Sequence, residues 1–250
     1  MNRKKLIQYV FVSFVTIALV GCVQSAKNCR YGLEGKSHAA VTPAHRFQWW
    51  GARHEAILER IQKGNVDLIF IGDSITHGWE GGGKELWSKY YAPRNAVNMG
   101  FGGDRTEHVL WRLEHGEIDG ISPKLAVLMI GTNNSNGDDY TAEQIADGIK
   151  TICCRLRRKL PKTKILILTI FPRGAQPSPQ REKNAKASRL ASQIADGKMI
   201  HYLDINDKFL TADGTLSKDI MPDLLHPNTR GYKIWAEAIE PVVARLMGEK

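Results

Sequence analysis

The stretch VDLIFIGDSIT, residues 66–76, decides the fold. Apolar residues run almost without interruption up to Ile71 and are followed directly by Gly72, Asp73 and Ser74. A short apolar run that ends in a glycine-containing loop is typical of a strand buried on both faces, as in a parallel sheet. Ser74 is therefore expected just beyond the carboxyl end of a strand, where ligands bind in open α/β sheets.

Four more apolar runs follow along the chain, so the predicted buried strands are 66–71, 96–99, 125–130, 165–170 and 199–203. Segments with apolar residues at helical spacing lie before, between and after them, and include 47–61, 145–160 and 235–246. Thr141 and Gln144 have the spacing of a capping box before the second of these helices. Alternating strands and helices predict a three-layer α/β/α sandwich around a mostly parallel five-stranded sheet.

The N-terminus has the pattern of an export signal. Three basic residues at positions 3–5 precede an apolar stretch at 6–20 that is shorter than the roughly 20 residues a spanning helix needs. Leu-Val-Gly-Cys at 19–22 resembles the bacterial lipoprotein box, which implies cleavage before Cys22 and lipid attachment there. We therefore expect a signal peptide at 1–21, a tether at 22–42, and one catalytic domain at 43–250 that is held at the cell envelope, on its periplasmic or cell-surface face.

The remaining bulk properties exclude little. The formal net charge is +9, and removal of residues 1–21 takes away three positive charges and leaves +6. A basic surface attracts polyanions, but no zinc-finger spacing or RNA-binding motif accompanies it, so no nucleic-acid partner is expected. With Cys22 lipidated, an odd number of cysteines remains (Cys29, Cys153 and Cys154), and at least one thiol is then unpaired.

A phosphate-binding loop is the competing interpretation of the segment after Ser74. Gly78 to Lys84 has the spacing Gly-x-x-x-x-Gly-Lys, yet Glu85 stands where a magnesium-binding hydroxyl is required. Glu80 would also place a carboxylate inside a loop built for an anion. We therefore expect no nucleotide here, and interpret 81–83 as a flexible turn that forms a mobile rim and leads into a helix around Trp87.

Asp223 and His226 are the candidate partners of Ser74. A serine hydroxyl becomes nucleophilic when a base within hydrogen-bond reach takes its proton, and a carboxylate usually holds that base in one tautomer. The sequence DLLHP, residues 223–227, supplies both groups on one short loop. The other candidate histidines, His108, His115 and His201, fall in helical or strand patterns and are expected to be structural.

Ester cleavage also requires donors directed at the developing oxyanion. The loop after the second strand contains Gly102 and Gly103, and the loop after the third contains Asn133. A backbone N–H at Gly103, the Asn133 side-chain amide and the N–H of Ser74 are candidate donors. The structural alternatives are a tight glycine turn and a cap at the strand end.

These landmarks, in this order, resemble those of the SGNH (GDSL) hydrolases. Residues 72–74 are similar to block I of that family, 100–103 to block II, 131–133 to block III, and Asp223 with His226 to block V. The stretch NMGFGGDRTEHVLWRLEHGEIDGISPKLAVLMIGTNN, residues 98–134, is most similar to the platelet-activating-factor acetylhydrolase Ib catalytic-subunit type, as are FPRG at 171–174 and REKNAKASRL at 181–190. The wider family has Asp where Asn134 stands, whereas the closer type shares the Asn-Asn pair.

The resemblance implies a flavodoxin-like fold and a role for each motif residue. It implies a catalytic triad of Ser74, His226 and Asp223, and an oxyanion hole made by the N–H groups of Ser74 and Gly103 with the Asn133 side chain. Asp73 is implied as an organiser of the loop. No metal or cofactor is implied, and the regulatory partners and phospholipid substrate of the eukaryotic enzymes are not carried over.

We therefore expect a serine esterase that cleaves short acyl groups, with acetyl groups on a carbohydrate as the expected substrate. Bulky side chains at Ile75 and Leu225, beside the nucleophile and the base, are expected to narrow the acyl pocket. A lipase or lysophospholipase is the alternative that a membrane tether favours, although no long apolar lid segment is found. A glycan-binding lipoprotein that has lost catalysis is the alternative from another class. The oligomeric state stays open.

Overall fold

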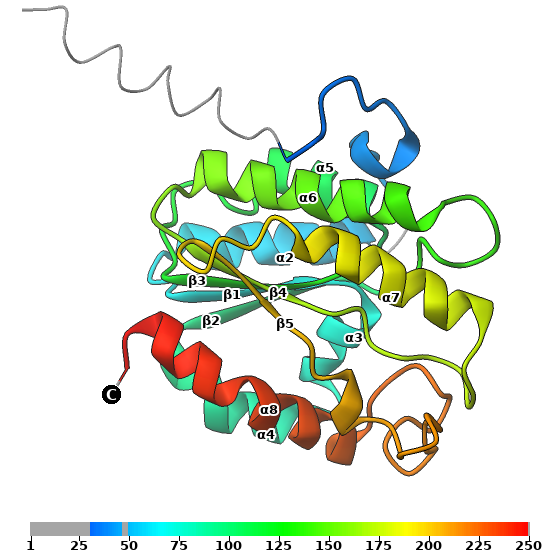
Figure 1. Cartoon of the computed structure of the whole chain (residues 1–250). Coiled ribbons are helices and arrows are strands. Elements are labelled where there is room, and N and C mark those ends of the chain that lie inside the picture. The colour runs from blue at the N-terminus through cyan, green and yellow to red at the C-terminus, as the bar shows by residue number, and fades with distance from the viewer. Residues whose placement is uncertain (1–30, 47–49, 250) are drawn as a thin grey trace, which may run out of the picture.

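A five-stranded parallel sheet forms the centre of the protein (Figure 1). The computed structural model describes residues 31–46 and 50–249. Within them the strands are β1 Leu68–Gly72, β2 Ala96–Gly100, β3 Leu125–Met129, β4 Lys164–Leu168 and β5 Ile200–Leu203. They lie in the order β2-β1-β3-β4-β5, and every neighbouring pair is parallel. The predicted fold class is confirmed.

The strand order places three loops at one point of the sheet edge. β1 lies between β2 and β3, and Gly72 at its end is level with Gly100 and Met129. The chain therefore moves to one side of β1 for β2 and to the other side for β3. Such a switch point opens a crevice beyond the carboxyl ends of the strands, where ligands bind in sheets of this kind.

Helices cover both faces of the sheet. One layer consists of α2 Trp50–Gln62, α5 Thr106–Glu114, α6 Ala142–Lys159 and α7 Pro179–Ser192, and the opposite layer of α4 Lys84–Tyr90 and α8 Thr229–Met247 (Figure 1). Because successive side chains of a strand point to opposite faces, Ile69 and Ile71 pack under the first layer while Leu68 and Phe70 pack under the second. All five residues of β1 and of β3 are buried.

The sequence predicts the start of α6 correctly but places the start of β1 too early. The capping box before α6 is confirmed, because Gln144 N–H donates to Thr141 Oγ1 at 3.2 Å and the Gln144 side chain accepts from Thr141 N–H at 2.9 Å. β1 begins at Leu68, two residues later than predicted. Asp67 instead accepts a hydrogen bond at 2.8 Å from the side chain of Asn95, in the turn before β2.

The last glycine of the run at 81–83 is packed more closely than a mobile rim would be, whereas the first two are exposed. It follows a 3₁₀ helix, Gly78–Glu80, and leads into α4. Gly83 is buried, and a Cβ there would lie 2.5 Å from the Trp79 ring and 2.9 Å from Tyr232. This glycine is needed for close contact with two aromatic rings. The predicted turn before a helix is present, but its third residue is fixed by packing.

The described part of the predicted tether ends against the domain. Ala40, in the 3₁₀ helix Ala39–Val41, is fully buried, and its carbonyl accepts a hydrogen bond from Thr106 Oγ1 at 2.9 Å. Packing therefore begins before residue 43, where the domain was expected to start. The predicted signal peptide, residues 1–21, and Cys22 lie outside the described residues. Among the helices formed by residues 31–46 and 50–249, none has the length and apolar character to cross a membrane.

Two adjacent cysteines of α6 differ in their chemistry. Cys153 is a free thiol, fully buried in the core, and burial raises its pKa. Cys154 is disulfide-bonded. The prediction that at least one thiol is unpaired is confirmed by Cys153, whose role is to fill space between helix and sheet.

Candidate active site

Ser74 lies where β1 ends and the short helix α3 Ser74–His77 begins. Asp73 caps this helix, since its Oδ1 accepts the N–H of Ile75 at 3.0 Å. The preceding Gly72 is required by crowding: a Cβ there would lie 2.1 Å from Thr76 Oγ1 and 2.4 Å from the Met129 carbonyl oxygen. The sharp turn presents the Ser74 hydroxyl at the edge of the sheet, where its Oγ lies 2.8 Å from His226 Nε2.

His226 is held by Asp223 from three residues away. Asp223 Oδ2 lies 2.6 Å from His226 Nδ1, and its Oδ1 accepts the N–H groups of His226 at 2.7 Å and of Leu225 at 3.0 Å. We call residues 223–226 the base loop. Ser74, His226 and Asp223 therefore form one continuous series of hydrogen bonds, as the sequence predicts for nucleophile, base and orienting carboxylate.

The charge state of Asp223 sets the tautomer of His226. Burial raises the pKa of Asp223, but the hydrogen bonds from the His226 ring and from two backbone N–H groups outweigh it, and the pKa lies below its ordinary value. An ionised carboxylate accepts only, so Nδ1 of His226 carries the proton. Nε2 is then left to accept the proton of Ser74.

The base loop is exposed but anchored at its centre. The side chains of His226 and Asp223 are 42% and 56% exposed. Leu224 between them has φ of +61°, in the left-handed region, with its N–H bonded to the Met221 carbonyl at 2.8 Å and its own carbonyl bonded to Gly174 N–H at 2.9 Å. These two backbone bonds hold the loop in the conformation that lets Asp223 reach back to the His226 ring.

The loop after β2 presents a backbone donor. In the turn 101–104, which we call the oxyanion turn, Asp104 N–H bonds to the Phe101 carbonyl at 3.1 Å, and Gly103 has φ of +75°. Within the described part of the chain, Gly103 N–H has no hydrogen-bond acceptor. A donor that is fixed in place but unused is what the oxyanion of an ester intermediate requires.

Asn133, in the loop after β3, is attached to the same turn. Its Nδ2 donates to the Asp104 carbonyl at 2.9 Å, which uses one of the two amide hydrogens and leaves the other. The neighbouring Asn134 is buried and serves a different purpose: its Oδ1 accepts the N–H of Thr106 at 3.0 Å, at the start of α5. Of the Asn-Asn pair, only Asn133 is available to the site.

Asp73 lies beneath the nucleophile with no exposed surface. Burial raises the pKa of its carboxyl to about 7, and the charge of Asp104 adds to this, while the Ile75 N–H and Arg173 oppose it. Its Oδ2 has no hydrogen-bond partner in the described residues. The contact with the Ile75 N–H is the geometry expected of a residue that organises the loop.

The structure does not support the acyl-pocket expectation for Ile75. Its side chain is 0% exposed and packs in the core between the sheet and α8, so it offers no surface to an acyl group. The reason is the helix that begins at Ser74: one residue further on, the side chain turns by about 100° and faces inward. Leu225 is half-buried on the base loop and keeps a position from which it could contact an acyl group.

The remaining histidines named as candidates make structural contacts. His108 Nδ1 accepts the N–H of Arg105 at 2.9 Å, and burial lowers the pKa of this histidine to about 3, with Arg46 and Arg105 adding to the effect. The His115 ring stacks on Trp111 with 3.7 Å between centroids. His201 Nε2 lies 3.2 Å from the carbonyl of Lys198.

Sequence reasoning missed the role of Arg173, which appears only within FPRG. Its Nη1 donates to the Thr132 carbonyl at 3.1 Å and to Asn136 Oδ1 at 2.9 Å. Burial lowers the pKa of Arg173, against the charges of Asp73 and Asp223. Arg173 is therefore bonded to the loop that bears Asn133 and lies within electrostatic range of Asp73 and Asp223.

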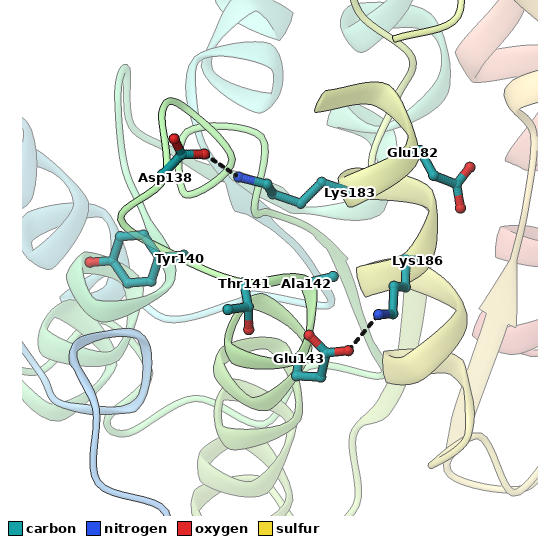
Figure 2. A pocket seen from close by; sticks show the side chains of 8 residues that line it. All are labelled: Asp138, Tyr140, Thr141, Ala142, Glu143, Glu182, Lys183 and Lys186. Atoms are coloured by element: carbon teal, nitrogen blue, oxygen red, sulfur yellow. Dashed lines mark ion pairs between the residues drawn. The ribbon is translucent and has the colours of Figure 1, made fainter. Parts of the chain in front are cut away.

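A polar groove continues from that loop toward α7. A hollow of about 430 Å³ lies between 135–138 and the start of α7, and a second of about 420 Å³ shares Asp138 and Lys183 with it. Figure 2 shows the second hollow, where Lys183 and Lys186 of α7 reach across to Asp138 and Glu143 at 3.8 and 2.7 Å. We call these two hollows the α7 groove. Its charged residues are largely paired with one another.

Ester hydrolysis is the chemistry for which this edge of the sheet is equipped, and comparison with known proteins gives the class. The sequence model of the GDSL-like Lipase/Acylhydrolase family matches residues 70–234. The chain belongs to this family of carboxylic ester hydrolases, and the predicted resemblance is confirmed.

Curated relatives agree with this assignment. The chain is 36% identical over 203 residues to platelet-activating factor acetylhydrolase IB subunit alpha1 of Homo sapiens, covering 81% of this chain and 85% of that protein. It is 35% identical over 223 residues to the alpha2 subunit of Mus musculus, covering 86% and 95%.

The fold is shared with more distant bacterial proteins. A GDSL-like lipase of Bacteroides thetaiotaomicron superposes with a TM-score of 0.60 at 19% identity, covering 78% of this chain and 96% of that one. An acetylxylan esterase of Geobacillus stearothermophilus superposes with a TM-score of 0.58 at 22% identity, covering 75% and 96%.

Proposed function

We propose that the protein is a serine acylesterase that removes acetyl groups, with Ser74 as nucleophile, His226 as base and Asp223 as the orienting carboxylate. The observation that carries the proposal is the unbroken series of hydrogen bonds from Ser74 Oγ through His226 to Asp223, at 2.8 and 2.6 Å. These distances lie within the range in which a base can take the proton of a nucleophile.

The reaction proceeds in two halves. Ser74 Oγ attacks the ester carbonyl while His226 Nε2 takes its proton, and the oxyanion is stabilised by the N–H groups of Ser74 and Gly103 and by the Asn133 amide. His226 then gives the proton to the leaving alcohol, and an acetyl-enzyme forms. Water, deprotonated by the same nitrogen, attacks this ester and releases acetate. His226 returns its proton to Ser74.

The acetyl group as the preferred acyl group is supported by the relatives. The curated relatives are named acetylhydrolases, and one structural neighbour is named an acetylxylan esterase. Because Ile75 is enclosed in the core, Leu225 is the remaining candidate for limiting the acyl chain. A series of nitrophenyl esters tests the preference, and faster cleavage of chains of eight or more carbons contradicts it.

Carbohydrate is the proposed alcohol component. The α7 groove supports this, because it is lined by amide, hydroxyl and paired charged groups that suit sugar hydroxyls better than lipid chains. Acetylated xylan and phospholipid vesicles offered to the same enzyme separate the two substrate classes. Release of acyl chains from the vesicles, without release of acetate from the xylan, would favour the lipase alternative.

Ser74→Ala tests the mechanism directly. Removal of the nucleophile should lower turnover of nitrophenyl acetate by at least about 10³-fold, because base and oxyanion hole alone cannot form the acyl-enzyme. Ser88→Ala is the matched control, since Ser88 is a serine of α4 whose hydroxyl donates to the Lys84 carbonyl at 3.0 Å, within its own helix. Turnover at the wild-type level in Ser74→Ala contradicts the proposal. It also contradicts the alternative of a glycan-binding protein without catalysis.

We also propose that the enzyme acts at the cell envelope as a lipoprotein anchored through Cys22. The sequence pattern at 1–22 supports this. Replacement of Cys22 by Ser should move the enzyme from the membrane fraction to the soluble fraction with its turnover intact, and retention in the membrane contradicts the anchor.

A further inference from the structure

We propose that Asp104 is the positioning residue of the oxyanion hole, and that a buried chain of charged side chains fixes it from the side opposite the substrate. Asp104 follows Gly103 directly and is fully buried. The inference rests on the proposed function, because it assigns a cause to the placement of donors that the proposed mechanism uses.

Asp104 controls both donors through its backbone. Its N–H closes the oxyanion turn on the Phe101 carbonyl at 3.1 Å, which sets the direction of the Gly103 N–H. Its carbonyl accepts the Asn133 Nδ2 at 2.9 Å, which sets the direction of the amide. A shift of this one residue therefore misdirects two donors that come from different strands.

The Asp104 carboxylate is in turn held on both of its oxygens. Oδ1 accepts Trp50 Nε1 at 2.9 Å and lies 3.6 Å from Arg46 Nη1, and Oδ2 accepts Arg112 Nε at 2.9 Å. The Arg112 side chain is fully buried and also bonds to Glu117. An aspartate that accepts from donors at both oxygens has one rotamer available to it.

The anchoring extends beyond Asp104 on both sides. Glu117 Oε1 lies 2.8 Å from His54 Nδ1, so the buried chain of side chains reaches α2. Arg112 Cζ lies 4.0 Å from the centre of the Phe101 ring, at the start of the oxyanion turn. Arg46 Nη1 donates to the Gly102 carbonyl at 2.8 Å. Phe101, Gly102 and Asp104 are thus each bonded or packed, and the Gly103 N–H is left for substrate.

Burial of four ionisable side chains is costly, and well-packed apolar residues of similar volume are often at least as stabilising as a buried ion pair. Their arrangement gives rigidity instead: preorganised donors stabilise an oxyanion without reorganising during the reaction. A positioning role predicts that disturbing Asp104 lowers kcat and leaves KM nearly unchanged, because the oxyanion exists only after attack.

Asp104→Asn tests the proposal. Asparagine keeps the shape, but its NH₂ replaces one of two acceptor oxygens. Because a donor faces both positions, the NH₂ meets a donor in either orientation, and the residue must shift. We expect kcat for nitrophenyl acetate to fall about 10- to 100-fold with KM within about two-fold, part of the loss seen when an oxyanion donor is removed. Asp147→Asn is the matched control, since Asp147 is a buried carboxylate of α6 that pairs with Lys36 and His38.

A double-mutant cycle distinguishes positioning from general destabilisation. If Asp104 acts through Asn133, the effect of Asp104→Asn on kcat should shrink several-fold in an Asn133→Ala background. An unchanged effect in that background overturns the proposal, as does a lower melting temperature with normal kcat. Should Asp104→Asn not fold, Trp50→Phe removes one bond to the carboxylate, and wild-type kcat in that variant overturns it too.

Failure of this inference is distinguishable from failure of the proposed function. Loss of turnover in Ser74→Ala together with normal kcat in Asp104→Asn leaves the serine mechanism in place and removes only the role of Asp104. Turnover retained in Ser74→Ala removes both.

Discussion

The base loop, which contacts Ser74, and the oxyanion turn, which follows the neighbouring strand β2, are held in place by different means. The base loop is exposed, and Asp223 bonds to groups no more than three residues away. In the oxyanion turn Asp104 is fully buried, and its partners Trp50 and Asn133 lie 54 and 29 residues away in the sequence. A proton-transferring group can be set by a local motif, whereas donors that must not move are set by the core.

The largest effect expected from this comparison is on the base loop. Asp223→Asn should lower kcat by about 10²–10⁴-fold, because an amide cannot both hold the Nδ1 proton of His226 and stabilise the imidazolium. The melting temperature should change little, since Asp223 is exposed and its bonds are local. Steady-state kinetics and thermal unfolding measure the two. Asp219→Asn, four residues earlier in the chain, is the control, and a loss below ten-fold contradicts the assignment.

A smaller effect, divided between activity and stability, is expected at the oxyanion turn. Gly103→Ala adds a Cβ 2.8 Å from Arg46 Nη1 at a φ of +75°. We expect about 10- to 100-fold lower kcat, and a stability loss of about 1 kcal/mol or more because alanine is strained at this φ. Gly120→Ala is the matched control: its φ is +74° with open space around it, so it should lose stability alone. Equal kcat in the two variants contradicts the role of Gly103.

The smallest effect is on stability alone and concerns Asp73, which lies between the two regions. Its pKa of about 7 in the folded protein exceeds the ordinary value of 3.8, so the fold favours the neutral acid. As pH rises from about 4 to 7, ionisation of a buried carboxyl lowers wild-type stability. Asp73→Asn avoids this loss, and its melting temperature relative to wild type should rise across that window.

The expected size of this effect of pH on stability follows from the burial of Asp73. A shift of this kind corresponds to a few kcal/mol at most, so a change of several degrees in melting temperature is the expected scale. Asp67→Asn is the control with the opposite sign, because a hydrogen bond from Asn95 lowers the pKa of Asp67. If the melting temperatures of Asp73→Asn and wild type differ by the same amount at pH 4 and pH 7.5, ionisation of Asp73 does not destabilise the fold.

The difference between local and long-range contacts also explains which features could be predicted from the sequence. Buried parallel strands appear as continuous apolar runs, and all five were found, with ends displaced by up to two residues. Asp223 and His226 could be paired because their contact is local. Gly103 and Asn133 could be named because each directly follows a strand that lies beside β1.

The contacts that hold Asp104 could not be predicted, because no spacing of residues along the sequence indicates them. Trp50 and Arg112 look like ordinary members of amphipathic helices, and only the packing of α2 and α5 against the oxyanion turn brings them to Asp104. The prediction that Ile75 lines the acyl pocket was wrong for a related reason. Its neighbours in sequence suggest a place in the site, but the helix that begins at Ser74 turns it into the core.

Arg46 and Trp50 precede residues 70–234, the span that the family model matches. The matched span therefore contains the proposed reacting groups but not every group that contacts the oxyanion turn. Exchange of residues 70–234 between relatives would separate the chemistry from part of its scaffold. If Asp104 has the proposed role, substitutions at Arg46 or Trp50 should change turnover without altering a residue that touches the substrate.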